Sequence, residues 1–201
     1  MALTATLART NYDAFKRETT DVDATTFYYW CDYVNKEFYR MLIGTDPERV
    51  ITSTTYSVST SPSTQALPAG FRDMATMGTG LYVRDSSGAD TTEQLVRTGF
   101  GSTEKGYYLS GSNIVFTGIN SSLTIVLRYI PAVTTISTGA GEFSIPDEYT
   151  PYVVNALDIL YSRWNDETDG EANADSRWIR LMEECFSSIR RDANIFLLTP
   201  M

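Results

Sequence analysis

The sequence predicts an α+β protein in which helices from both ends of the chain form a small helical bundle around an inserted antiparallel β-meander. In residues 1–50 and 144–191, apolar side chains recur at spacings of three and four residues, as on one face of a helix. In residues 51–143, short alternating runs are separated by turns that contain Gly and Ser, which is typical of strands. Residues 192–201 form an apolar C-terminal tail.

The N-terminal region predicts one long helix. Its apolar face consists of Phe27, Trp30, Val34, Phe38 and Leu42. Asp21 or Asp23 is placed to cap the start of this helix, and Gly44 followed by Asp46-Pro47 should end it. A shorter helix over residues 5–18 precedes it and carries Leu7, Tyr12 and Phe15 on its apolar face.

The middle region changes from helical to strand periodicity. Residues 52–65 contain ten Ser or Thr in fourteen, which fits either a linker or an exposed strand, because Tyr56 and Val58 alternate with small residues. Five further runs predict strands: 81–84, 94–97, 107–109, 114–116 and 123–130. Turns at 86–88, 110–112 and 118–120 separate them, so we expect a meander of about five or six strands. In the last strand, Leu123, Ile125, Leu127 and Tyr129 should share one face.

The C-terminal region predicts a helical hairpin. Ser144, Pro146 and Asp147 combine a hydroxyl cap, an early proline and an acid in the first turn, which together favour a helix start. The apolar face of the first helix is Val153, Leu157, Leu160 and Trp164. After an acidic loop, a second helix carries Trp178, Leu181, Cys185 and Ile189. The two helices should pack antiparallel.

Composition excludes several functions. The chain has 201 residues with 42% hydrophobic and 20% charged, which is a globular composition. Lys and Arg number 16 against 25 Asp and Glu, a net charge of -9, and the cations are scattered, so direct nucleic-acid binding is not expected. No basic leader and no membrane-length apolar run is present, so we expect a cytoplasmically made protein without membrane contact.

The residues of common catalytic sites are missing or isolated. Histidine is absent, which removes histidine-dependent triads and imidazole metal sites. Cys31 and Cys185 fall on apolar helix faces, so we interpret them as buried small side chains rather than reactive thiols. Catalysis by carboxylates alone stays open on residue types, with Asp73, Asp85 and Glu93 as candidates. We expect no enzyme activity and no cofactor.

Three ligand-binding patterns are incomplete. Asn165-x-Glu167-x-Asp169-Gly170 resembles the start of a calcium loop, but the twelfth position, which needs glutamate, is Ser176. Gly78-Thr79-Gly80 has no third glycine, because Val83 stands there. Gly139-Ala140-Gly141 precedes a helix start, yet Glu142 has the wrong charge for an anion site. We expect no metal.

The apolar side chains of the C-terminal tail must be shielded from water. An exposed apolar segment lowers solubility unless it docks on its own domain or on a neighbouring protein, and both remain open here. The residues concerned are Ile195, Phe196, Leu197, Leu198 and Met201.

The order of landmarks along the chain adds a resemblance. The motifs are Val34 to Arg40, Leu67 to Arg72, Leu127 to Pro131, Ile145 to Tyr149 and a last helix ending Ile189-Arg190-Arg191. This succession resembles the head-to-tail adaptor (connector) proteins of the virion neck in tailed bacteriophages. The resemblance implies a structural, non-catalytic protein assembled in the host cytoplasm. It implies a homo-dodecameric ring of about twelve copies beneath the portal, with a tail or stopper protein on its other face. DNA would pass through the channel without specific binding.

By position, the resemblance also implies that residues 192–201 contact the portal protein. Two alternatives remain beside this function. One is another virion protein, a head-closure or tail-completion component. The other is a β-rich module that binds a small ligand or glycan through exposed tyrosines: Tyr56, Tyr82, Tyr107 and Tyr108.

Overall fold

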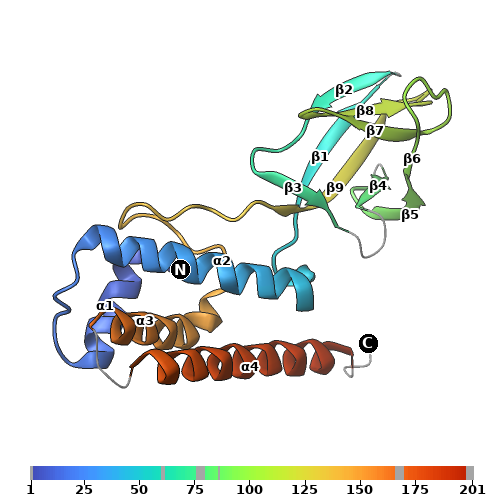
Figure 1. Ribbon diagram of the computed structural model, residues 1–201. Coiled ribbons are helices and arrows are strands. Elements are labelled where there is room, and N and C mark those ends of the chain that lie inside the picture. The colour runs from blue at the N-terminus through green and yellow to red at the C-terminus, as the bar shows by residue number, and fades with distance from the viewer. Residues whose placement is uncertain (1, 60–61, 76–79, 86, 166–169, 198–201) are drawn as a thin grey trace. The chain divides into compact units, whose positions relative to one another are not determined.

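The chain divides into two compact units. The computed structural model describes residues 2–59, 62–75, 80–85, 87–165 and 170–197 (Figure 1). The helical unit comprises Met1–Val50 and Val133–Met201, and the β unit comprises Ile51–Ala132. The segment from residue 133 to 143, which the sequence analysis grouped with the strands, therefore belongs to the helical unit.

Two helices form the N-terminal part of the helical unit. Helix α1 (Ala5–Lys16) begins at Thr4, whose side chain accepts a hydrogen bond from the backbone of the first turn. Helix α2 (Ala24–Thr45) begins at Asp23, whose Oδ1 accepts the Thr26 N–H at 3.0 Å. A short-chain acceptor at this position satisfies a backbone donor that the helix leaves free. Asp23 is thus the cap among the two predicted acids.

The predicted face of α2 is buried, whereas that of α1 is only partly so. Phe27, Val34 and Phe38 are at most 1% exposed. On α1, Tyr12 is fully buried but Phe15 is 53% exposed, so the prediction of Phe15 as a core residue was wrong. Helix α2 is followed by a 3-10 turn, η1 (Pro47–Arg49).

The predicted start of the third helix, with Ser144 as its cap, was five residues too early. The proline and the acids form a 3-10 turn, η2 (Asp147–Tyr149), and helix α3 (Thr150–Trp164) follows it. Ser144 does not cap the helix, because its hydroxyl instead accepts the Thr134 N–H at 2.9 Å. The proline and the acids thus did predict a helical turn. Ser144 is no cap because its hydroxyl is bound to Thr134, ten residues earlier in the chain.

Helix α4 (Gly170–Leu197) is antiparallel to α3 (Figure 1). Arg177 pairs with Asp158 at 2.6 Å, and Arg163 pairs with Asp175. The end of α3 therefore lies beside the start of α4, as in an antiparallel pair. Trp164 is 47% exposed and was wrongly predicted as core. The buried positions of α3 are Val153, Val154, Ala156, Leu157 and Ile159.

Two sheets build the β unit. Its strands are β1 (Thr52–Val58), β2 (Ser63–Ala66), β3 (Phe71–Met74), β4 (Leu81–Arg84), β5 (Asp90–Gln94), β6 (Val96–Arg97), β7 (Gly106–Ser110), β8 (Asn113–Thr117) and β9 (Leu123–Pro131). One sheet has the order β1-β9-β4-β5, with β3 also paired to β9. The other has the order β2-β8-β7-β6. The Ser/Thr-rich tract therefore contributes strands β1 and β2.

The strand order differs from the predicted meander. Strand β9 pairs with β1 from Thr52↔Tyr129 to Val58↔Leu123 and with β4 and β3 on its other edge. The short β6–β7 pair is parallel, although no helix connects these strands. Turn residues predict where strands end, but partners across the chain are selected by packing between distant residues.

An apolar cluster joins the two sheets of the β unit. Tyr56 of β1 and Phe116 of β8 place their ring centroids 5.7 Å apart. Ile125, Leu127 and Tyr129 of β9 belong to the cluster and Leu123 packs against it, so the predicted face of this strand is confirmed. Gly80 allows the close approach of β4 and β9, because a Cβ there would lie 2.8 Å from the Arg128 carbonyl oxygen.

Candidate functional site

The two cysteines are buried and chemically quiet. Both are free thiols with 0% exposure, as predicted from their helix faces. Burial raises the pKa of Cys31 and of Cys185 to about 12, because an apolar surrounding disfavours the thiolate. A nucleophilic cysteine needs the opposite environment. Neither thiol therefore marks a reactive site.

The candidate carboxylates have structural partners. Asp85 accepts hydrogen bonds from Ser87 and Ala89 in a turn, and these bonds lower its pKa. Glu93 is paired with Lys105, and Asp73 accepts the Met74 N–H at 2.8 Å. Within the described ranges, no three or more acidic or thiol side chains are gathered as metal ligands would be.

Among the three incomplete ligand-binding patterns, the structure fully describes only the Gly139–Gly141 loop, which has a structural role. The backbone oxygens of Gly139 and Gly141 accept the Thr6 and Ala5 N–H groups, so this loop covers the first turn of α1. Gly78 and Thr79 lie outside the described residues, as do Glu167 and Asp169 of the calcium-like loop.

The tyrosines of the ligand-binding alternative do not form an exposed aromatic surface. Tyr56 and Tyr107 are each only 9% exposed. The Tyr56 hydroxyl donates to the Ala66 carbonyl at 3.0 Å, and the Tyr107 hydroxyl donates to Met74 Sδ at 3.1 Å. Tyr82 and Tyr108 are half-buried. The prediction that all four are exposed was therefore wrong for two of them, because alternate strand residues face the core.

The predicted portal-contact residues lie at the margin of the described chain. Helix α4 extends to Leu197, so the backbone of the predicted tail is helical up to that residue. Leu198 and Met201 are outside the described residues. The side chains of Ile195, Phe196 and Leu197 are likewise outside the described part, and their contact with a portal stays a prediction.

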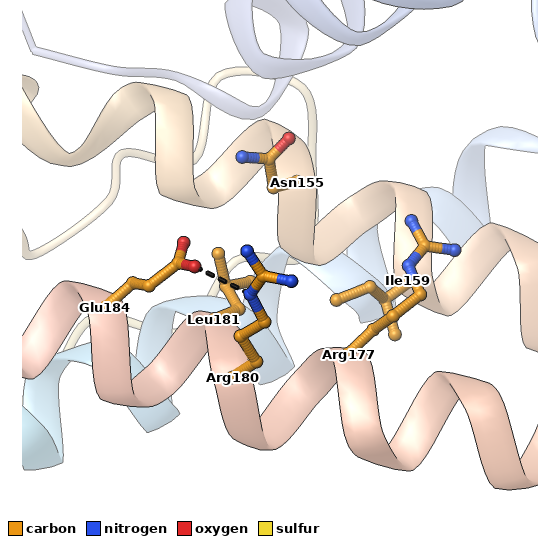
Figure 2. Close-up of a pocket in the computed structure, with 6 residues that line it drawn as sticks. All are labelled: Asn155, Ile159, Arg177, Arg180, Leu181 and Glu184. Carbon is orange, nitrogen blue, oxygen red and sulfur yellow. Dashed lines mark hydrogen bonds and ion pairs between the residues drawn. The ribbon is translucent and has the colours of Figure 1, made fainter.

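The seam between α3 and α4 is closed by ion pairs. Its shallow cavity of about 220 Å³ is lined by Asn155, Ile159, Arg177, Arg180, Leu181 and Glu184 (Figure 2). Arg177 binds Asp158, and Arg180 Nε donates to Glu184 Oε1 at 2.9 Å. Both arginines are therefore engaged within the chain. Among the described residues that line the seam, both cations are therefore already paired with acids, so these residues leave no free cation for an anionic ligand.

A second groove, between α2 and α4, is the candidate functional site. It has a volume of about 340 Å³ and is lined by Met41, Trp178, Ile179, Met182, Glu183 and Phe186. Ile179 is 59% exposed at its edge, and Tyr33, 39% exposed, packs its ring 5.6 Å from Trp178. Apolar side chains gathered in an exposed groove are typical of a protein-docking surface.

This groove was not predicted from the sequence, because the apolar residues of α4 had indicated a single apolar face. Leu181 and Cys185 do face the core, with 5% and 0% exposure. Trp178, Met182 and Phe186 follow one another at four-residue spacing and form a second apolar face beside the first. That spacing was a readable signal, but Trp178 had been assigned to the core face.

The family model of the SU10 adaptor protein matches residues 5–197. The chain belongs to the SU10 adaptor protein family. This membership confirms the resemblance to phage head-to-tail adaptors and covers both units of the fold. Among curated proteins, none matches the chain significantly. In the part of this adaptor that the structure describes, each helix is too short or too polar to cross a lipid bilayer.

Proposed function

We propose that this adaptor forms a ring beneath the portal in the virion neck, joins the DNA-filled head to the tail and continues the DNA channel. The ring contains about twelve copies, as the resemblance to head-to-tail adaptors implies, and one repeated head-to-tail contact between neighbours closes it. The portal protein contacts one face of the ring, and a tail or stopper protein contacts the other. The observation that carries the proposal is the family match over residues 5–197.

The chemistry of the chain supports a structural role of this kind. An exposed apolar groove on the helical unit favours a lasting contact with another protein. The net charge of -9 suits a DNA conduit, because a channel that bound phosphates would slow the passage of DNA. Ion pairs within the chain engage several of its cations, including Arg49, Arg163 and Arg177.

The portal contact is assigned to the C-terminal segment, residues 192–201. Up to Leu197 this segment prolongs α4, and its apolar residues would be covered once it lies against the portal. The proposed contact residues are Ile195, Phe196, Leu197, Leu198 and Met201.

Co-sedimentation with purified tailless heads tests this function. The adaptor is mixed with DNA-filled heads that carry the portal and with heads that lack it. We expect saturable binding to the portal-bearing heads alone, at about twelve copies each. A chain truncated after Arg191 should keep its helical circular dichroism and thermal transition but lose this binding.

Three outcomes would change the proposal. Absence of binding to both kinds of head, with the tail partner also supplied, overturns the adaptor function. Cross-links to tail components without any to the portal favour a head-closure or tail-completion protein. Loss of folding in the truncated chain places residues 192–201 in the core of the helical unit instead of at the portal.

A further inference from the structure

A single phenylalanine projects from the β unit at the loop between β6 and β7. Phe100 is 90% exposed, and its ring lies edge-on to that of Tyr108, with centroids 5.6 Å apart. Gly99 and Gly101 flank it, and Gly101 has a φ of +78°, a conformation that favours glycine. Small neighbours on both sides leave the ring free to enter a cavity.

Hydrogen bonds hold this loop in one shape. The Ser102 N–H donates to the Gly99 carbonyl at 3.2 Å and closes a tight turn around Phe100. At the two ends of the loop, the Thr98 N–H donates to the Tyr107 carbonyl at 2.7 Å, and the Thr117 hydroxyl donates to the Glu104 carbonyl at 2.7 Å. An exposed aromatic ring on a preorganised loop has the properties of an interface anchor, because little entropy is lost when it docks.

The groove between α2 and α4 has the properties of a matching socket. Its lining is apolar except for Glu183, and its volume of about 340 Å³ accommodates an aromatic ring. Trp178 and Phe186 supply aromatic surface on which a ring can pack. The groove and the loop belong to different units of the chain.

The charges beside the loop and the groove are opposite. Arg97 stands exposed on β6, three residues before Phe100, and Glu183 is exposed at the groove. Neither side chain has an ion-pair partner among the residues described. A cation beside the ring and an anion beside the socket favour one orientation of docking.

We propose that the Phe100 loop of one adaptor copy docks into the α2/α4 groove of a second copy. The contact is head-to-tail, because the loop and the groove are different surfaces of one chain, and repetition of such a contact closes a ring. This inference rests on the proposed function, since it names the surfaces by which neighbouring subunits of the ring meet.

Cross-linking between engineered cysteines tests the contact. In solution at high protein concentration, a chain with both Thr103→Cys in the Phe100 loop and Ser187→Cys, one turn of α4 after Glu183, is treated with a short thiol-specific cross-linker. Both positions are exposed and neutral, so Arg97 and Glu183 keep their charges. The native Cys31 and Cys185 stay unreactive because both are fully buried. We expect a ladder of covalent oligomers from the double variant. The two single variants should yield no product separately and only dimers when mixed.

Phe100→Ala in the double-cysteine chain should lower the yield of cross-linked oligomers about tenfold or more, because it removes a central aromatic anchor. Phe15→Ala is the matched control, because Phe15 is also an exposed phenylalanine but does not line the groove. That control should leave the ladder unchanged. A second cysteine placed at Glu18 instead of Ser187 should give no cross-linked oligomers.

Several results overturn the contact. Dimers formed by the Ser187→Cys single variant alone would show a groove-on-groove contact. A cross-link within one monomer would show that the loop docks on its own chain, and absence of any product would show that the two surfaces do not meet. A ladder without binding to portal-bearing heads would retain this contact and reject the neck function. Binding of about twelve copies to portal-bearing heads, with no cross-linked oligomers formed, would support the neck function and reject this contact.

Discussion

The helical unit and the β unit are stabilised by different kinds of long-range contact. In the helical unit, side chains of α2 bind the backbone of a segment about a hundred residues away. Asn35 Nδ2 donates to the Thr134 carbonyl at 2.9 Å, and Asn35 Oδ1 accepts the Ser144 N–H at 2.7 Å. Asp32 Oδ1 accepts the Ile136 N–H at 2.9 Å. Each of these bonds depends on one polar side chain.

The β unit relies on backbone pairing and one apolar cluster. Strands β1 and β9, next to the two points where the chain enters and leaves this unit, pair over seven residues from Thr52↔Tyr129 onward. Their core faces meet side chains from the second sheet, among which Phe116 and Ile114 are fully buried. The entry and exit strands thus hold each other, and the inserted unit completes its own core.

The contrast explains how the helical unit tolerates the insertion. The first and last strands of the β unit pair with each other, and polar bonds of α2 hold the two parts of the helical unit together. The two units should therefore respond separately to mutation. All three tryptophans lie in the helical unit, so their fluorescence follows that unit alone. Amide hydrogen exchange of β9 follows the β unit.

The largest effect is expected from a cavity in the β unit. Phe116→Ala removes a fully buried ring and should cost about 3–5 kcal/mol of unfolding free energy. Exchange protection of β9 should fall while the tryptophan unfolding transition stays in place. Phe100→Ala, which truncates an exposed phenylalanine of the same unit, should change neither measurement. An equal shift of the tryptophan transition would show that the two units unfold as one.

A smaller effect on the other unit is expected from Asn35→Leu. Asn35 is fully buried, and its loss leaves a carbonyl and an N–H group without their partner. Such groups cost about 2–3 kcal/mol together when partly shielded from water. The tryptophan transition in denaturant should move to lower concentration, with β9 exchange unchanged. Asn35→Asp keeps the acceptor for Ser144 but turns a carboxylate oxygen toward the Thr134 carbonyl oxygen, so at neutral pH it should be at least as destabilising as the Leu variant. A Leu variant as stable as the parent would show that water replaces both bonds.

The same contrast explains what could be predicted from the sequence. Helix positions followed from three- and four-residue periodicity, and the choice of Asp21 or Asp23 as the cap of α2 followed from local chemistry, because both depend on residues within a few positions. The structure selects Asp23. The pairing of β9 with β1, β3 and β4 did not follow, since it depends on packing between residues far apart in the chain. Ser144 failed as a cap for the same reason, because Thr134 occupies its hydroxyl.

The candidate site was harder to predict than the fold. A buried and an exposed apolar face on one helix have the same composition, so Trp178 was assigned to the core with Leu181 and Cys185. Only the position of α2 beside α4 decides which face is covered. The exposure of Phe100 likewise depends on the turn around it and not on its residue type.

The smallest expected effect is a difference between the two units in how their unfolding free energy depends on pH. Burial raises the pKa of the Cys31 thiol from 9.0 to about 12, so between these values the folded chain keeps a proton that the unfolded chain releases. Unfolding free energy must then fall as pH rises through this window, by about 1 kcal/mol at pH 10. Cys185 acts in the same direction. In the β unit, burial raises the pKa of Tyr56 and Tyr107 from an ordinary value of 10.0. The β unit should therefore begin to lose unfolding free energy only at a higher pH than the helical unit.

Denaturant unfolding at pH 8, 9 and 10 measures this difference, with tryptophan fluorescence for the helical unit and exchange of β9 for the β unit. The tryptophan transition should weaken first, because thiolates form in the unfolded chain before tyrosinates do. The variant with Cys31→Ala and Cys185→Ala starts from a lower stability, since two small cavities are created, but its transition should be flat from pH 8 to 10. If that variant kept the pH dependence of the parent, the thiols would not be its cause. Buried Tyr12, whose pKa burial also raises, would then be the titrating group of the helical unit.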